Sequence, residues 1–188
     1  MSSSSSEKNT RNLIWFLIAA VCVLVDQITK VLVVKNIELY KTVNVIGDFS
    51  QFTHIRNTAA GFSLGENLPS FWKVVLIKIV PLLFILGIVY ILIFSDKYEI
   101  KTRMEKLSLA LIIGGGFGNL VDRFFRKDGV VDFIRVKVYG LFGMDYWPVF
   151  NIADSVVVIG VILLLVFVLI INPIKQSKAN KLNAASAK

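Results

Sequence analysis

The stretch Phe150-Asn151-Ile152-Ala153-Asp154 opens the last long apolar run of the chain. The twenty residues from Ile152 to Ile171 carry one charge, that of Asp154. A run of this length can span a bilayer as a helix. A carboxylate inside such a helix is costly, so Asp154 is a candidate functional residue. Asn151 lies three residues earlier, on the same helical face. The sequence therefore predicts a membrane helix with polar side chains at its start.

The composition indicates an integral membrane protein. Of the 188 residues, 55% are hydrophobic, and the mean hydropathy is +0.69, which is too apolar for an ordinary soluble domain. The net charge of +8 comes from basic residues that cluster at the ends of apolar runs, which favours contact with lipid headgroups over nucleic acid. Cys22 is the only cysteine and His54 the only histidine, so we expect no disulfide, no metal and no cofactor.

Four apolar runs predict a mainly α-helical membrane protein with one four-helix domain over residues 12–171. The predicted spans are about 12–34, 71–94, 106–125 and 149–171. Lys8 and Arg11 before the first run also fit a secretory signal peptide, but no small-residue cleavage site follows, so we expect an uncleaved first span. Pro81 is expected to kink the second span, and the glycines of the third predict close helix packing.

The segments between the spans are of two kinds. Residues 95–105 are short and charged, whereas residues 35–70 and 126–148 are longer. Val130 to Tyr139 alternates between apolar and basic side chains, and residues 35–70 mix apolar with polar ones, which predicts short strands. The positive-inside rule places the polar tails 1–11 and 172–188 in the cytoplasm. We therefore expect a small extracytoplasmic β-structure beside the four helices.

This alternation of spans brings almost every polar residue that is costly in lipid to one depth, near the outer interface. The opposite ends of the spans are expected to carry no comparable group. The convergent residues come from the ends of the spans and from the outer segments: Asp26, Lys30, Arg56, Asn57, Asn119, Asp122, Arg123, Asp132, Asn151 and Asp154.

Two carboxylates that share a site cannot both ionise cheaply, so the pair holds a proton. One member can then activate water as a base while the other acts as an acid. Asp26 has Lys30 one turn further on, and Asp122 directly precedes Arg123, so each has a candidate ion-pair partner. Because Asp26 and Asp122 each have such a partner, elimination favours Asp132 and Asp154 as the two carboxylates that share a proton. On chemistry alone, the choice among the four carboxylates stays open.

Five motifs follow one another along the chain. They are Asp26-Gln27-Ile28-Thr29-Lys30, Arg56-Asn57, Gly118-Asn119-Leu120-Val121-Asp122-Arg123, Val130-Val131-Asp132-Phe133 and Phe150-Asn151-Ile152-Ala153-Asp154. In order and spacing, over about Leu13 to Ile171, they resemble the motifs of the lipoprotein signal peptidase (signal peptidase II) family. The resemblance implies an aspartic endopeptidase of the bacterial inner membrane, which removes signal peptides from diacylglyceryl-modified prolipoproteins by cutting before the lipidated cysteine. It also implies inhibition by globomycin-type cyclic peptides.

By position, the resemblance implies that Asp132 and Asp154 form the catalytic pair. It implies a polar shell that orients the pair and binds the substrate backbone, formed by Asn57, Asn119, Arg123 and Asn151. It implies a structural pair near the site, Asp26 and Lys30. The chain departs from the family at Ala59-Ala60-Gly61, where the usual order is Gly-Ala-Ala, so the local loop conformation should differ. The segment Gly140 to Pro148 is also longer than usual, and residues 55–70 are a candidate lid.

Two other classes of protein compete with this interpretation. A small proton-coupled carrier could use intramembrane aspartates as relay groups, but such sites lie at mid-bilayer and often between internal repeats. Here the polar residues gather at one face, and the sequence shows no repeat. An assembly subunit without chemistry would not need two carboxylates and three asparagines at one depth. The pattern favours the peptidase.

Overall fold

The structure, a computed structural model, describes residues 3–58, 69–100 and 102–174, and residues 3–11 by their backbone alone. Its helices are α1 (Ser3–Asn36), α2 (Ser70–Val74), the π-helical turn η2 (Val75–Ile79), α3 (Val80–Ile93), α4 (Arg103–Phe125), α5 (Ile152–Val166) and the π-helical turn η4 (Phe167–Ile171). In this part of the chain, four helical stretches are long and apolar enough to cross a membrane: Asn12–Asn36, Ser70–Ile93, Arg103–Phe125 and Ile152–Ile174. The strands are β1 (Thr42–Ile46), β2 (Ser50–Asn57) and β3 (Val130–Val136). The predicted fold class, four membrane helices with a small β-structure, is confirmed.

Two helices begin where a capping box forms, and neither start coincides with the predicted one. In α5, the Asn151 side chain accepts the N–H of Asp154, and the Asp154 carboxylate accepts the N–H of Asn151. Phe150 pairs with Ile134 of β3 instead of joining the helix, so α5 starts three residues after the predicted position 149. A reciprocal pair of Thr102 and Glu105 likewise starts α4 at residue 103. Capping boxes satisfy N–H groups that the first helical turn leaves free.

Pro81 lies at the second position of α3, directly after the π-helical turn η2. Proline has no N–H to offer the carbonyl four residues earlier, and its ring crowds that carbonyl, so a wider turn relieves the clash. The carbonyl four residues earlier is that of Ile77, which accepts a hydrogen bond from Nη1 of Arg123 at 3.1 Å. The proline therefore leaves the Ile77 carbonyl without its usual helical donor, and the bond that this carbonyl accepts from Arg123 links the second span to α4.

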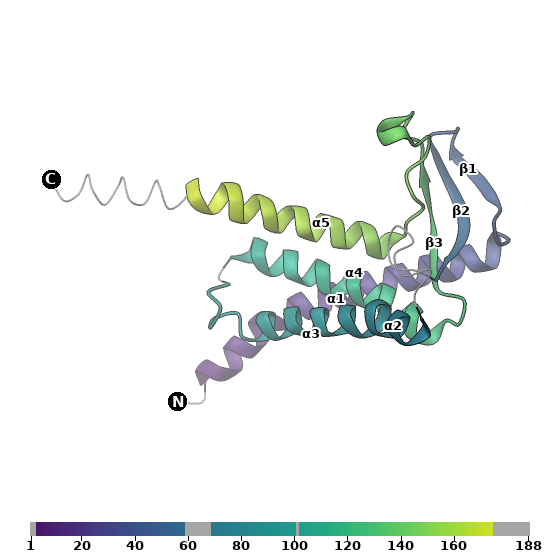
Figure 1. Cartoon of the computed structure of the whole chain (residues 1–188). Coiled ribbons are helices and arrows are strands. Elements are labelled where there is room, and N and C mark those ends of the chain that lie inside the picture. Colours follow the sequence, from purple (N-terminus) through teal and green to yellow (C-terminus); the bar gives the residue numbers. More distant parts are fainter. Residues whose placement is uncertain (1–2, 59–68, 101, 175–188) are drawn as a thin grey trace.

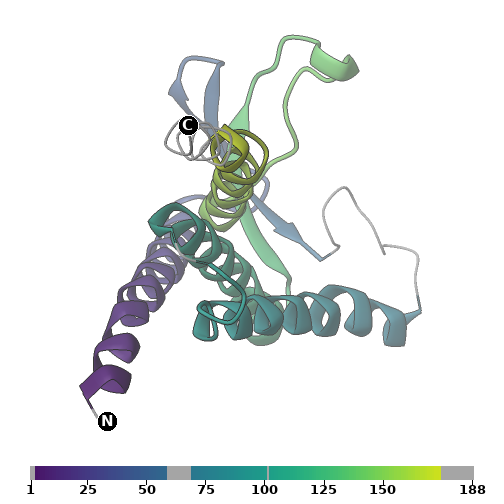
Figure 2. The ribbon, with the colours of Figure 1, turned by 90° about the vertical axis from the view of Figure 1, so that its left-hand side faces the viewer.

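Helix α4 is the centre of the bundle and lies between α1, α3 and α5 (Figure 2). Three successive glycines allow this, because each turns a different side of α4 to a different neighbour. A Cβ at Gly114 would meet Ala19 and Cys22 of α1, one at Gly115 would meet Ala153 and Val157 of α5, and one at Gly116 would meet Ile85 of α3. Small residues let helix backbones approach closely in lipid.

These contacts predict unequal effects for two neighbouring substitutions. Gly115→Ala should destabilise the fold by about 1–3 kcal/mol, because its methyl group would overlap the backbone carbonyl of Ala153, which cannot move alone. Gly116→Ala should cost less, because it meets only the side-chain end of Ile85. The midpoint of thermal unfolding in detergent measures both. Equal losses in the two variants would contradict the packing described.

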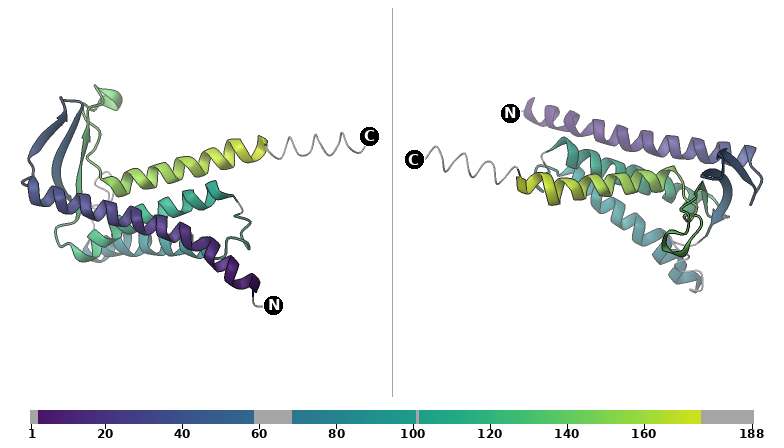
Figure 3. Two further views of the ribbon diagram at one scale, coloured as in Figure 1. Left: turned by 180° about the vertical axis from the view of Figure 1, so that it is seen from behind. Right: turned by 90° about the horizontal axis from the view of Figure 1, so that it is seen from above.

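The sheet lies across the end of the bundle where α1 ends and α5 begins (Figures 1 and 3). Its three strands are antiparallel in the order β1-β2-β3. Val43, Phe52 and Ile134 stand side by side on one face. On the other face, Arg135 donates to Gln51 at 3.4 Å, and Gln51 donates to Asn44 at 2.9 Å. At these positions the sheet is therefore apolar on one face and polar on the other, whereas Val131 and Phe133, further along β3, are buried against Val33 of α1.

The expectation that the opposite ends of the spans carry no comparable polar group is wrong. Lys106 is only 6% exposed, and its Nζ donates to Oδ1 of Asn12 at 3.0 Å. Asn12 in turn donates to the carbonyl of Leu92 at 3.3 Å and to Oγ of Ser95 at 3.4 Å. The last carbonyls of a helix have no partner within it. This cluster supplies hydrogen-bond donors to the free carbonyls at the end of α3. Counting the charged residues in the sequence does not reveal that these carbonyls need donors.

Candidate active site

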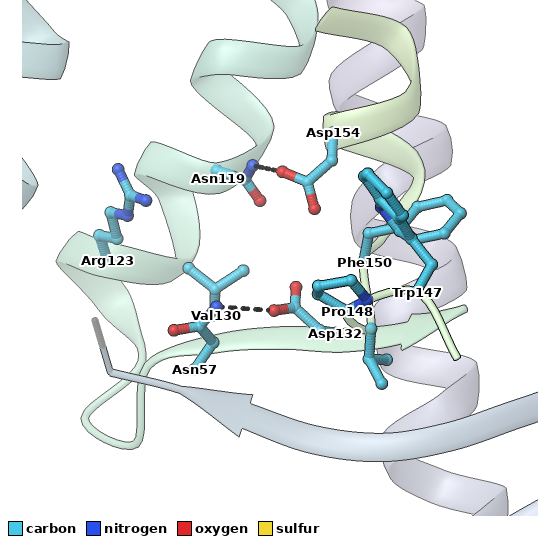
Figure 4. A pocket seen from close by; sticks show the side chains of 10 residues that line it. Asn57, Asn119, Arg123, Val130, Asp132, Trp147, Pro148, Phe150 and Asp154 are labelled. Atoms are coloured by element: carbon cyan, nitrogen blue, oxygen red, sulfur yellow. Dashed lines mark hydrogen bonds between the residues drawn. The ribbon is translucent and has the colours of Figure 1, made fainter. Parts of the chain in front are cut away.

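Five of the residues singled out in the sequence come from four elements and surround one cavity of about 250 Å³ (Figure 4). Asn57 ends β2, Asn119 and Arg123 lie on α4, Asp132 lies on β3, and Asp154 lies in the first turn of α5. The two aspartates approach from opposite sides, one from the sheet and one from the bundle (Figure 4). The lining residues are Asn57, Asn119, Arg123, Val130, Asp132, Trp147, Pro148, Val149, Phe150 and Asp154.

Asp154 is held by the capping box that starts α5. Its Oδ2 accepts the backbone N–H of Asn151 at 3.0 Å, and its Oδ1 accepts Nδ2 of Asn119 at 2.7 Å. The carboxylate is therefore fixed from two directions, by its own helix and by α4. The sequence placed Asn151 on the same face of the helix. In the structure Asn151 caps that helix.

Asp132 is held by two amides and is only 4% exposed. Its Oδ1 accepts Nδ2 of Asn151 at 2.7 Å, and its Oδ2 accepts Nδ2 of Asn57 at 2.9 Å. Burial raises the pKa of Asp132 to about 6, because a charge there loses its hydration. The hydrogen bond from Asn57 lowers this pKa, the nearby charge of Asp154 raises it, and the bond from Asn151 lowers it.

Asn151 joins the two aspartates. It is fully buried, and its Nδ2 group contacts Oδ1 of Asp132 at 2.7 Å and Oδ1 of Asn119 at 3.0 Å. Its own Oδ1 accepts the N–H of Asp154 at 3.0 Å. One residue thus contacts both carboxylates, that of Asp132 through its side-chain amide and that of Asp154 through its backbone N–H. The amide of Asn119 continues the chain of bonds to Asp154.

Behind these asparagines lies a buried ion-pair cluster. Nζ of Lys30 lies 2.8 Å from Oδ2 of Asp26 and 2.8 Å from Oδ2 of Asp122, and all three side chains are fully buried. The same Nζ donates to Oδ1 of Asn119 at 3.1 Å. An ammonium group has three hydrogens to donate, and each of these partners can take one. Lys30 therefore contacts the residue that holds Asp154.

The two acids of this cluster also fix the backbone on either side of the cavity. Oδ1 of Asp26 accepts the N–H of Ala153 at 3.0 Å, and Oδ2 of Asp122 accepts the N–H of Val131 at 3.3 Å. Asp122 also pairs with Nε of Arg126 at 2.8 Å. The adjacent Arg123, which the sequence suggested as its partner, instead donates to the carbonyl of Ile77, because neighbouring helical residues face different directions. Spacing by four residues was the signal that could have found Arg126.

Arg123 lies between the second span and the cavity. Its Nη1 donates to the carbonyl of Ile77, while its Nε is buried and has no hydrogen-bond partner among the described residues. A buried donor without a partner is costly.

A second, apolar cavity adjoins the first. Its volume is about 510 Å³, and it shares Trp147, Phe150 and Asp154 with the cavity of the two aspartates. It leads from Asp154 to Val158 and Ile159, which are exposed on the outer side of α5. The full lining is Val136, Val138, Trp147, Phe150, Asp154, Ser155, Val158 and Ile159.

The remaining candidates lie elsewhere. In the described part of the chain, no group of three His, Cys, Asp or Glu residues is placed to hold a metal. The ring of His54 contacts the carbonyl of Ile37 at 2.8 Å, and Cys22 packs against Gly114 of α4. The altered Ala59-Ala60-Gly61 stretch, most of the candidate lid and the C-terminal tail from residue 175 lie outside the described residues.

Comparison with known proteins gives one consistent answer. A family model described as signal peptidase (SPase) II matches residues 18–170. The chain is 41% identical over 153 residues to the lipoprotein signal peptidase of Borrelia turicatae, covering 81% of this chain and 87% of that one. It is 42% identical to that of Treponema denticola, covering 76% and 81%. A solved structure of a bacterial membrane enzyme superposes with a TM-score of 0.69 at 31% identity, covering 83% and 87% of the two chains.

Proposed function

This chain belongs to the signal peptidase (SPase) II family, and from that premise we propose that it is an aspartic endopeptidase. Its substrates would be diacylglyceryl-modified prolipoproteins, from which it removes the signal peptide by cutting before the lipidated cysteine. The observation that carries the proposal is the pair Asp132 and Asp154, which line one cavity and are linked through the side chain of Asn151. No cofactor or metal enters the proposed chemistry.

The two carboxylates take different parts in the proposed reaction. Asp132, with a pKa raised to about 6 by burial, holds a proton more readily than an ordinary aspartate. Asp154 takes a proton from water, which attacks the scissile carbonyl, while Asp132 gives its proton to the carbonyl oxygen. The tetrahedral intermediate collapses when the leaving amine receives the proton that Asp154 took from water and one hydroxyl of the intermediate returns a proton to Asp132. The Nε donor of Arg123 and the amides of Asn57 and Asn119 orient the peptide and the carboxylates.

The apolar cavity supports the lipid part of this proposal. It begins at Asp154 and ends among residues that face outward from α5. A lipid chain attached to the cysteine beside the cut could lie in it and remain in contact with the bilayer. A globomycin-type cyclic peptide would compete for the same two cavities.

We place the protein in the bacterial inner membrane, with both termini in the cytoplasm. The basic tails and the charged segment 95–105 support this orientation through the positive-inside rule. The sheet and the aspartate pair then lie at the extracytoplasmic face, where signal peptides emerge.

The direct test uses purified protein and a peptide that spans the cleavage site, with and without diacylglyceryl on its cysteine. We expect cleavage before the cysteine of the lipidated peptide, and a kcat/KM about 100-fold lower without the lipid, since remote binding energy is lost. Equal turnover of both peptides would contradict the proposed role of the apolar cavity in binding the lipid chain. No cleavage of either would favour the carrier alternative.

The pH profile tests the role of Asp132. Because this residue must hold a proton, kcat/KM should fall as the pH rises through about 6. Asn57→Ala removes a hydrogen bond that favours the ionised form, so the pKa of Asp132 rises and the falling limb moves to higher pH. Asn44→Ala, on the far edge strand β1, is the control. If the fall of kcat/KM stays at the same pH in Asn57→Ala, then it reports the titration of a group other than Asp132.

A further inference from the structure

The segment that joins β3 to α5 contains a turn with large exposed apolar side chains. The turn contains the short 3₁₀ helix η3 (Leu141–Gly143). Tyr139 is 73% exposed, Leu141 54% and Phe142 79%. Clustered apolar groups of this size are unfavourable in water and indicate a contact surface. We call residues 139–144 the apolar turn.

The part of the chain that the structure describes does not cover this turn. Phe142 has a φ of 54° and Tyr139 a φ of 52°, which is the left-handed region that these residues rarely adopt. A Cβ added at Gly140 or Gly143 would meet nothing within 4 Å. The turn is closed by its own backbone bonds, including that from the N–H of Gly140 to the carbonyl of Met144 at 3.0 Å. Its side chains therefore point outward from a backbone that holds its own shape.

The turn bends towards the side of the sheet on which the helices lie. In Figure 1 it leaves the end of the sheet and bends back to the side on which the helices lie, standing apart from the start of α5, and the rear view in Figure 3 shows the same bend. The helices of this multi-pass protein lie in the bilayer. The side towards which the turn bends is therefore the lipid side.

The surface between the turn and the bundle is also apolar. Val136 and Val138 lead from the sheet to the apolar cavity, and Val158 and Ile159 continue it along the exposed side of α5. The turn thus extends a surface that already faces lipid. A loop that faced water would be expected to carry polar side chains rather than to continue this apolar surface.

Basic and aromatic groups flank the turn where the lipid headgroups would lie. Nζ of Lys137 lies 5.6 Å from the ring centre of Tyr139 and 5.9 Å from that of Tyr146. The guanidinium of Arg135 stacks 3.8 Å from the ring centre of Tyr146. Aromatic rings and cations beside an apolar tip are typical of the membrane–water interface.

We propose that the apolar turn is a membrane anchor, with Leu141 and Phe142 inserted among the lipids of the adjacent leaflet and Arg135 and Lys137 at their headgroups. The anchor holds the sheet down on the bilayer next to α5. Its consequence for substrates rests on the proposed function: the mouth of the apolar cavity stays against lipid, so a lipidated cysteine enters without crossing water.

Fluorescence quenching in vesicles tests the anchor without any assay of activity. A single tryptophan is introduced as Phe142→Trp in a protein whose native tryptophans are replaced by Trp15→Phe, Trp72→Phe and Trp147→Phe. The protein is reconstituted in phosphatidylcholine–phosphatidylglycerol vesicles with brominated acyl chains. We expect about two-fold quenching relative to unbrominated vesicles, since the ring should lie at the interface. The matched control is Asn44→Trp in the same background, on the polar face of the sheet, which should be quenched little.

Two results would overturn the anchor. One is equal, weak quenching of the two single-tryptophan proteins. The other is an unquenched residue 142 together with a disulfide crosslink between copies carrying Phe142→Cys and Cys22→Ser, which would make the turn a protein interface. Because neither readout uses cleavage, failure of the anchor and failure of the proposed peptidase activity are separable.

Discussion

Asp154→Asn and Asp132→Asn should each lower kcat for the lipidated peptide by about 1,000-fold or more, since each removes a group that must gain or give a proton. Asparagine has nearly the same shape. In Asp154→Asn, the new amide oxygen can still accept the N–H of Asn151, so the capping box and the start of α5 are preserved. The rate is measured by chromatography of the two peptide products.

A matched control separates this effect from a general loss of charge. Asp48→Asn changes a 70% exposed carboxylate in the turn between β1 and β2 that pairs loosely with Lys137 at 3.8 Å. It should leave kcat unchanged, and all three variants should keep the unfolding midpoint of the wild type within a few degrees. Full activity in either Asp154→Asn or Asp132→Asn would refute the proposed pair.

Hydropathy and topology accounted for much of the architecture. Apolar runs of membrane length gave four helices, and alternation along Val130–Val136 gave β3. The convergence of polar residues at one depth followed from the order of the spans. These features are set by local composition, which a single sequence displays directly.

The features that sequence reasoning missed depend on partners far along the chain. The hydrogen bond from Lys30 to Asn119 joins residues 89 positions apart, and that from Lys106 to Asn12 joins residues 94 apart. No periodicity encodes such pairs. The capping boxes at Thr102 and Asn151 are unlike these long-range pairs, because their partners are three residues apart. Thr102 with Glu105 is a local signature that the sequence does contain. Elimination left the choice of aspartates open, and the structure brings Asp132 and Asp154 to one cavity while enclosing Asp26 and Asp122 with Lys30.

That enclosure predicts the largest loss of stability. Lys30→Met should destabilise the fold by about 3–5 kcal/mol, because it leaves the buried carboxylates of Asp26 and Asp122 without their cation. Activity should fall as well, since Asn119 loses one of the two donors that fix its Oδ1, and with it part of what orients its bond to Asp154. The midpoint of unfolding and the kcat of the surviving protein are measured in the same detergent.

Two further variants decide whether burial of the charge is the cause. Lys137→Met removes a half-exposed lysine whose partner Asp48 is exposed, so the loss should be at most about 1 kcal/mol. Adding Asp26→Asn and Asp122→Asn to Lys30→Met removes the stranded charges. It should recover part of the lost stability, because neutral amides cost less to bury than unpaired carboxylates. It should not restore kcat, because Asn119 still lacks the contact from Lys30 that orients it towards Asp154. A triple variant no more stable than Lys30→Met would mean that packing around the lysine, rather than its charge, holds this end of the bundle together.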